Sequence, residues 1–459
     1  MRGILSWGTY LPHRRLDRTT IASIAGGGGG SGTRTVASYD EDTTTMGVEA
    51  ARAALLTAPL GAVPSSLWFS TVSPAYLDKT NATAMHAALR LARTTPAYDA
   101  IGSVRSALGA LRSALQSSGP ALAVAADLRG GLPGSPDESA GGDGAAALLL
   151  GADDAGPVVA EVIAWATATE EFLDRWRTPG EMRSKVWEER FGEGRYIELG
   201  HDALAGALKD AGIDGEHVDQ LIVTGTHDRA VAAVTKASGL AEKAVDRLAA
   251  SVGNTGAAHP TLLLASAIER ATPGQVIVVL ALADGADCIV LRTTEALAAH
   301  PRPRSVTEQA AGGAGVAYGK FLAWRGVLPV EPPRRPEPAR PSASAAGRTR
   351  DWKFGFVGSE GTDGAVHLPP SLLDDRARPM ADARGSIVTF TVDRLTYSPS
   401  PPVVFAVVDF DGGGRLPIEL TDVDPDEVEI GQRVEMTFRR LFTADGIHNY
   451  FWKGRLIRG

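Results

Sequence analysis

An alternation of short strand-like runs and alanine-rich helical runs fills residues 1–295, and it limits the fold of this chain more than any other feature. Ser66–Val72 and Gln275–Leu282 are apolar runs of strand length, whereas Val104–Leu115 has the small-residue pattern of a closely packed helix. Strands that alternate with helices favour an α/β layered architecture. A second succession of the same kind begins near Val158, so the sequence predicts two α/β halves. Further helices are expected at Thr45–Leu56, Thr80–Leu91, Asp202–Ala211 and Leu262–Ala271.

The C-terminal residues 384–459 follow a different pattern. Five short runs of β-branched and aromatic residues are separated by turns rich in Asp and Gly, which predicts a small all-β barrel. Residues 296–350 include six prolines between Pro329 and Pro341, a composition typical of an extended linker. Tyr318–Val327 predicts a short amphipathic helix ahead of it. The linker is either a plain spacer or a segment that packs along a surface and positions the barrel.

The charge balance and the single cysteine exclude several classes of protein. The net charge is −8 and the run Asp422–Glu429 is acidic, whereas proteins that bind nucleic acid usually present a basic surface. Because Cys288 is the one cysteine, an intramolecular disulfide and a cysteine-rich zinc site are excluded, which suits a reducing cytoplasm. We find no signal-peptide pattern and no run of about 18 apolar residues, so we expect a cytoplasmic protein without a membrane span.

Three motifs in the first 295 residues resemble the thiolase superfamily. They are S-Y-D-E-D-T-T-T-M-G-V-E-A-A-R-A-A-L at Ser38–Leu55, G-T-H at Gly225–His227 and V-G-N-T-G at Val252–Gly256. The resemblance is closest to hydroxymethylglutaryl-CoA synthases and initiating ketoacyl synthases. It implies a duplicated five-layer αβαβα fold with halves at 1–157 and 158–295, and it implies that the protein forms homo- or hetero-oligomers.

The C-terminal region resembles the OB-fold domain that accompanies these enzymes. The motifs are D-F-D-G-G-G-R-L at Asp409–Leu416 and Y-F-W at Tyr450–Trp452. The resemblance assigns 384–459 to the OB-fold and 351–383 to a zinc ribbon, which usually opens with C-x-x-C-G. Here Phe354 and Val357 replace the two cysteines. Zinc needs thiolate or imidazole ligands, so we predict no metal and a hairpin held by hydrophobic packing.

The resemblance also assigns the catalytic positions. The family cysteine, which takes the acyl group from CoA, falls at Val104, five residues after Asp99. The family glutamate, a general acid and base, falls at Val72. The histidine and asparagine that bind the thioester carbonyl oxygen are retained as His227 and Asn254.

Aliphatic side chains at two of the three reactive positions predict that this fold has no catalytic activity by itself. Loss of a nucleophile costs many powers of ten in rate. Ser103 and Ser106 would not project where Val104 does, because a helix turns about 100° per residue. We expect these serines to be small packing residues and Cys288 to be a buried apolar residue. For His227 two interpretations stay open, contact with a bound acyl thioester or a core role.

Two functional hypotheses follow. In the first, the chain is a hydroxymethylglutaryl-CoA synthase-like pseudo-enzyme fused to an acyl-CoA-binding OB-fold. It then acts as a non-catalytic subunit beside a thiolase-type acyltransferase, which supplies the reactive cysteine. In the second, the chain is an active acyl-CoA transferase, condensing enzyme or thioester hydrolase that uses His227 without a cysteine.

Overall fold

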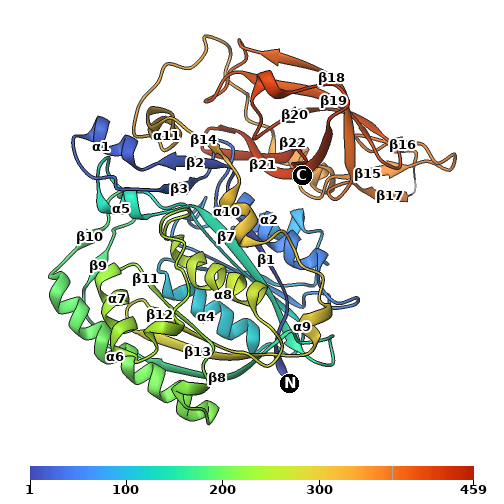
Figure 1. Ribbon diagram of the computed structural model, residues 1–459. Helices are drawn as coiled ribbons and strands as arrows, with labels where there is room; N and C mark the ends of the chain where they lie inside the picture. Colours follow the sequence, from blue (N-terminus) through green and yellow to red (C-terminus); the bar gives the residue numbers. More distant parts are fainter. Residues whose placement is uncertain (375, 459) are drawn as a thin grey trace. The chain divides into compact units, whose positions relative to one another are not determined.

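The computed structural model describes residues 1–374 and 376–458, which form two compact units (Figure 1). The first, called here the α/β unit, contains Met1–Ala37, Glu49–Ala82 and Arg93–Tyr318. The second, called here the barrel unit, contains Ser38–Val48, Thr83–Ala92 and the chain from Gly319 onward. The first unit therefore extends past residue 295, and the second takes two short segments from the N-terminal part of the sequence.

The α/β unit is built on a nine-stranded sheet in the order β11-β12-β13-β8-β1-β7-β6-β4-β5 (Figure 1). Its strands are β1 (Arg2–Tyr10), β4 (Ser66–Thr71), β5 (Ala97–Ile101), β6 (Ala121–Asp127), β7 (Gly144–Ala152), β8 (Ala160–Ala168), β11 (Gln220–Gly225), β12 (Val276–Leu282) and β13 (Ala286–Thr293).

The sheet repeats one topology on both sides of the β1–β8 pair. In the first half β5, β4 and β6 pair in parallel and then β7 and β1 follow as antiparallel neighbours. In the second half β11 and β12 pair in parallel and β13 and β8 follow in the same antiparallel way. The counterpart of β5 is reduced to a single parallel bridge between Leu221 and Ala244. This repeat confirms the predicted duplication.

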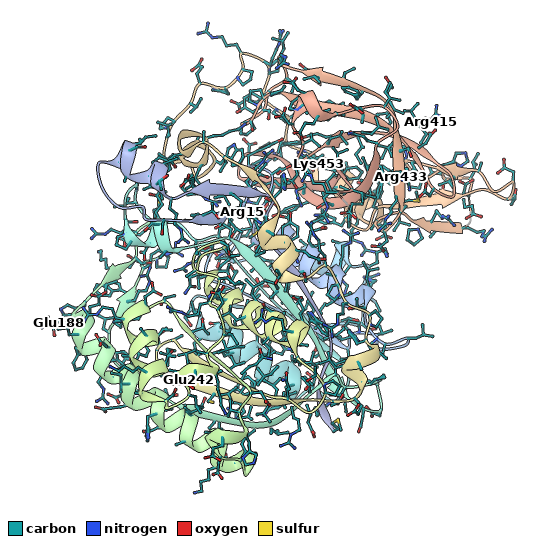
Figure 2. All side chains as sticks on the ribbon, in the orientation of Figure 1. Arg15, Glu188, Glu242, Arg415, Arg433 and Lys453 are labelled. Atoms are coloured by element: carbon teal, nitrogen blue, oxygen red, sulfur yellow. The ribbon has the colours of Figure 1, made fainter. Side chains whose placement is uncertain are left out.

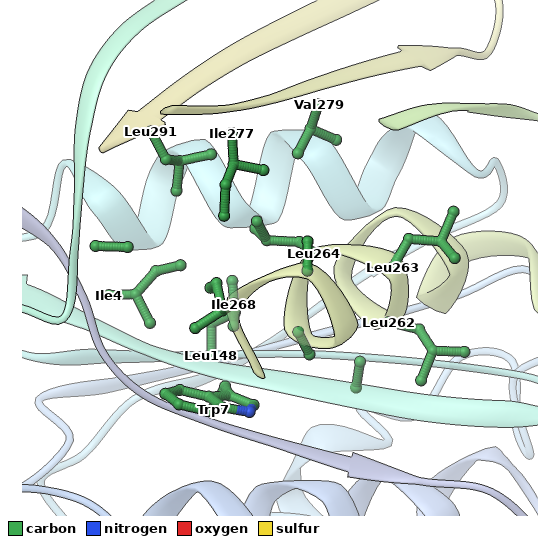
Figure 3. Close-up of a cluster of buried hydrophobic side chains, with 14 of the residues drawn as sticks. Ile4, Trp7, Leu148, Leu262, Leu263, Leu264, Ile268, Ile277, Val279 and Leu291 are labelled. Carbon is green, nitrogen blue, oxygen red and sulfur yellow. The ribbon is translucent and has the colours of Figure 1, made fainter. Parts of the chain in front are cut away.

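Helices separate and cover the two halves of the sheet. Helix α8 (His259–Arg270) contacts β1 and β7 of the first half and β11 and β12 of the second. Its Leu264 and Ile268 share one core with Ile4 of β1 and Ile277 of β12, so the helix is buried on all sides (Figure 3). Burial of each such side chain stabilises the fold by roughly 1.5–3 kcal/mol.

The outer faces are covered by other helices, which completes the five layers. Helix α6 (Glu189–Ala211) packs on β8, β12 and β13, with α7 (Asp228–Ala237) beside it. Helix α2 (Thr43–Leu56) lies close to β1 at Gly8, where a Cβ atom would come within 2.3 Å of the Ala50 carbonyl oxygen. The predicted αβαβα arrangement is thus confirmed, with α4 (Arg105–Leu115) beside α8 in the middle layer.

The barrel unit contains a closed barrel in the order β18-β19-β20-β22-β21, which confirms the predicted OB-fold class. Trp452 and Phe438 are fully buried inside it. A three-stranded sheet, β16-β15-β17, precedes the barrel in sequence. The strands are β15 (Val357–Glu360), β16 (Val366–His367), β17 (Arg376–Pro379), β18 (Arg384–Asp393), β19 (Val403–Phe410), β20 (Arg415–Leu420), β21 (Arg433–Ala444) and β22 (Ile447–Leu456).

Short elements complete the chain: α1 (Thr19–Ala25), α3 (Ala82–Ala88), α5 (Pro136–Ala140), α9 (Ala296–Ala299), α10 (Val306–Ala311), α11 (Tyr318–Trp324), α12 (Ala343–Arg348), α13 (Arg350–Lys353), β2 (Arg14–Asp17), β3 (Thr33–Val36), β9 (Arg175–Trp176), β10 (Lys185–Val186) and β14 (Ala314–Gly315). Across residues 1–374 and 376–458, no helix is both long and apolar enough to cross a membrane.

Candidate functional site

Val104 immediately precedes the first turn of α4 and lies half-buried between the two halves of the α/β unit. It lines a cavity of about 10 Å³ together with Thr224, Gly225, Thr226, Asn254, Gly256, Pro260, Ala281 and Leu282. A cavity of this size has room for about one water molecule. The structure therefore brings Val104 and Asn254 together at one small cavity.

Asn254 is held by backbone groups on both sides of its amide. Its Nδ2 atom donates to the Gly225 carbonyl oxygen at 2.7 Å, and its Oδ1 atom accepts from the Gly256 amide at 2.9 Å. Gly256 adopts φ +58°, and a Cβ atom there would lie 2.2 Å from Asp127 Oδ2. The side chain of Asn254 thus fixes a tight turn at the cavity wall.

His227 is the N-cap residue of α7, and both of its ring nitrogens have partners. Nδ1 accepts a hydrogen bond from the Ala230 amide at 3.1 Å, so Nε2 carries the proton and donates to the Glu189 carbonyl oxygen at 2.9 Å. The ring meets Tyr196 edge-on with centroids 5.9 Å apart. Asp174 Oδ1 lies 3.8 Å from Nε2, and burial raises the pKa of that carboxyl group.

Two of the four family positions, His227 and Val72, are not among the described residues that line the small cavity beside Val104. The backbone of Val72, just after β4, donates to Asp127 Oδ1 at 2.7 Å and accepts from Arg177 Nη2 at 2.7 Å.

Two charged residues near this region carry no family assignment in the sequence. Asp127, at the end of β6, accepts from Thr71 Oγ1 at 2.8 Å and from the Ala257 amide at 2.6 Å, and burial raises its pKa. Arg105, next to Val104, donates to Asp287 Oδ2 at 2.9 Å. The sequence could have indicated them by position, since Asp127 ends an apolar strand and Arg105 begins a helix rich in small apolar residues. Both have structural partners that join loops of the two halves.

The other nucleophilic side chains have local partners. Ser103 Oγ lies 3.4 Å from Ser106 Oγ, and Ser106 Oγ lies 3.4 Å from the Ile101 carbonyl oxygen. Within 1–374 and 376–458, neither hydroxyl bonds to a histidine. Cys288 is buried in β13, and burial raises the pKa of its thiol to about 12, which keeps it protonated and unreactive.

The two positions that align with the family's zinc cysteines contact protein groups instead. Phe354 has ring centroids 6.2 Å from Phe438 and 6.4 Å from Tyr450, and Val357 opens β15. Nearby, His367 Nδ1 lies 2.6 Å from Asp374 Oδ2. The described residues hold no group of three or more His, Cys, Asp or Glu side chains placed for a metal ion. The side chains present do not fit a zinc ribbon, and the absence of zinc stays a prediction.

Comparisons with known proteins agree with this architecture. A family model described as the 3-oxoacyl-acyl-carrier-protein synthase III C-terminal domain matches residues 208–292, and one described as the ChsH2 C-terminal OB-fold domain matches residues 377–439. The hydroxymethylglutaryl-CoA synthase of Aeropyrum pernix is 29% identical over 346 residues, which cover 72% of this chain and 95% of that protein.

Solved structures show the same fold at lower identity. The structure of a hydroxymethylglutaryl-CoA synthase complexed with CoA superposes with a TM-score of 0.59 at 17% identity, covering 70% of this chain and 89% of that one. The 3-oxoacyl-acyl-carrier-protein synthase III of Aquifex aeolicus gives a TM-score of 0.55 at 20% identity, covering 64% and 100%.

The fold, the repeat and these matches together define a protein with a thiolase-superfamily domain joined to a C-terminal OB-fold domain. Within that superfamily the first domain is similar to hydroxymethylglutaryl-CoA synthases and to 3-oxoacyl-acyl-carrier-protein synthase III, and the barrel is of the ChsH2 type.

The capping role of His227 makes a first testable prediction. His227→Ala should lower the free energy of unfolding by about 1 kcal/mol or more, because the α7 cap and the bond to the Glu189 carbonyl oxygen are lost. His227→Asn should lose less, since asparagine is a good N-cap residue. Urea unfolding of both variants measures the difference, and equal losses would contradict the capping role. His201→Ala, at an exposed position on α6, is the matched control.

Proposed function

We propose that this chain is a hydroxymethylglutaryl-CoA synthase-like pseudo-enzyme fused to an acyl-CoA-binding OB-fold. It acts as a non-catalytic subunit of a thiolase-type acyltransferase complex in a reducing, cytoplasmic compartment. The observation that carries this proposal is Val104, an aliphatic side chain at the head of α4 beside a cavity of about 10 Å³. A hydrocarbon side chain cannot form a thioester.

Three further features support a silent site. Val72 occupies the position that the resemblance assigns to the general acid and base, and such a group contributes about 10²–10⁴ in rate. His227 uses both ring nitrogens to join α7 and α6. Asn254 bonds to two backbone groups. A rebuilt mechanism based on the histidine would first have to break these contacts.

The ligand and partner are inferred from the similar proteins. One similar structure is a hydroxymethylglutaryl-CoA synthase complexed with CoA, and another is the curacin pathway synthase in complex with an acetyl donor acyl carrier protein. Coenzyme A and acyl carrier proteins both carry acyl groups on a pantetheine thiol, which favours the same ligand class here. The second domain, of the ChsH2 type, favours assembly with another subunit. We propose that a partner thiolase supplies the cysteine.

Activity of the isolated chain tests the proposal. Full-length protein, purified without partners and mixed with acetyl-CoA and acetoacetyl-CoA, should form no hydroxymethylglutaryl-CoA above background. Intact-mass spectrometry should find no acyl adduct, while isothermal titration should show saturable binding of acyl-CoA.

Each alternative has its own outcome in these experiments. Turnover that His227→Ala abolishes and His201→Ala preserves would establish the active-enzyme hypothesis instead. An acyl adduct on Ser103 or Ser106 would show rebuilt covalent chemistry. A chain that neither reacts with nor binds acyl-CoA would contradict the acyl-CoA-binding role, while leaving the partner role to affinity purification from the native host.

A further inference from the structure

The motif Asp40-Glu41-Asp42 is buried in spite of its charge. The exposed fractions of these three residues are 0%, 2% and 4%. Acidic side chains are almost never fully buried unless they are paired. The three residues belong to Ser38–Val48, the segment of the N-terminal region that forms part of the barrel unit.

Basic side chains of the barrel pair with the first two acidic residues. Asp40 Oδ2 lies 2.9 Å from Lys453 Nζ and accepts from Thr421 Oγ1 at 2.8 Å. Glu41 Oε1 lies 3.3 Å from Arg439 Nη2. Lys453 and Arg439 are themselves fully buried, so these charges face one another away from solvent.

The rest of the segment is held by hydroxyl and backbone bonds and by a longer ion pair, 3.8 Å between Arg440 Nη1 and Asp42 Oδ2. Asp42 Oδ2 accepts from Tyr450 Oη at 2.7 Å. The Arg440 amide donates to the Asp40 carbonyl oxygen at 2.9 Å, and Arg440 Nη2 donates to the Tyr39 carbonyl oxygen at 2.7 Å. The barrel therefore contacts both the side chains and the main chain of the acidic segment.

This arrangement has the properties of a recognition surface. Without the acidic segment, Lys453 would retain Glu419 and Arg439 would retain Asp422, but each would lose a buried partner charge. Loss of one partner from a buried ion pair is strongly unfavourable. The residues in contact are 381 to 408 positions apart in sequence in these hydrogen-bonded pairs, so the contact does not depend on local chain connectivity.

We propose that β20, β21 and β22 form a receptor for an acidic segment at the head of a helix, and that the receptor holds this segment without help from the linker. In this chain the occupant is the chain's own Asp40-Glu41-Asp42. The partner chemistry is three consecutive carboxylates followed by a helix start, since α2 begins at Thr43. The proposal concerns assembly of the barrel and is independent of the proposed function.

Cutting the linker tests whether the receptor binds its segment in trans. A protease site inserted between Pro336 and Pro341 of the full chain allows the backbone to be cut after folding, so that only non-covalent contacts hold the two pieces together. Size-exclusion chromatography over a dilution series should find the cleaved wild-type pieces together. With Asp40→Asn and Glu41→Gln combined, the apparent Kd between the pieces should rise by at least about tenfold. Glu242→Gln, at an exposed site, is the matched control.

A milder variant protects the test against simple unfolding. Thr421→Val removes the hydroxyl that bonds to Asp40 and leaves every charge in place, so it should weaken association by several-fold while circular dichroism stays native. Pieces of the cleaved wild type that separate on dilution would overturn the proposal. So would an unchanged Kd in both the double variant and Thr421→Val.

Discussion

Lys453→Met should lower the free energy of unfolding by about 3–5 kcal/mol, because it removes the nearest counter-charge from the buried carboxylate of Asp40. Lys453 follows Trp452 on β22, so it points to the opposite face of the strand, where it is fully buried (Figure 2). It forms ion pairs with Asp40 at 2.9 Å and with Glu419, and its ammonium group lies 5.1 Å from the centre of the Tyr39 ring. Methionine fills similar space but supplies no charge.

The same substitution should change the response of stability to acid. Burial by itself raises the pKa of Asp40, but Lys453 and Arg439 together outweigh burial and hold that pKa below its ordinary value. A carboxyl group with a lowered native pKa stabilises the fold above its unfolded pKa of about 3.9, and this contribution is lost as the pH falls towards the native pKa. Wild-type stability should therefore fall below about pH 4, and the fall should be shallower in Lys453→Met.

Denaturant unfolding at pH 7 and between pH 2 and pH 5 measures both effects. Lys209→Met is the matched control, because Lys209 is exposed on α6 and its loss should change stability by no more than about 0.5 kcal/mol. If Lys453→Met and Lys209→Met were equally stable, the buried ion pairs would have no net effect on folding.

The layers of the fold could be predicted from the sequence because each depends on local pattern. The apolar run Gln275–Leu282 became β12, and the small-residue run Val104–Leu115 became α4. Helix α6 begins at Glu189, well before the expected Asp202. The sequence did not indicate its first turns, because they contain Gly192 and Gly194 and have little apolar periodicity. Tertiary packing on β8 and β13 stabilises a helix that local propensity does not indicate.

Long-range pairing of charges could not be predicted in the same way. The residues around Asp40 in the sequence do not predict its ion pair with Lys453, because only the tertiary fold brings these two distant residues together. The same holds for buried Arg34, which lies 3.3 Å from Asp143. At the candidate site the resemblance named Val104, Asn254 and His227, but it could not indicate the bond from His227 Nε2 to the Glu189 carbonyl oxygen, because the start of α6 was not predicted.

Phe356→Ala should also lower the free energy of unfolding by about 3–5 kcal/mol, the usual cost of removing a buried aromatic ring. Phe356 is fully buried ahead of β15, with ring centroids 5.3 Å from Trp352, 5.8 Å from Phe451 and 5.9 Å from Phe410. Its φ of +48° lies in the left-handed region, which a bulky residue occupies only where packing enforces it. The ring therefore joins the start of β15 to β19 and β22 of the barrel.

Chelation distinguishes this aromatic packing from a metal site. Prolonged treatment with a zinc chelator should leave the Tm of the wild type unchanged, whereas Phe356→Ala should lower it by several degrees with or without the chelator. Phe405→Ala is the matched control, because Phe405 on β19 is 42% exposed and its loss removes little buried area. A fall in Tm on chelation, with zinc found by elemental analysis, would show that other ligands replace the missing cysteines. Since Phe354 and Val357 offer no ligand atoms, that metal would have to recruit side chains that the described structure keeps apart.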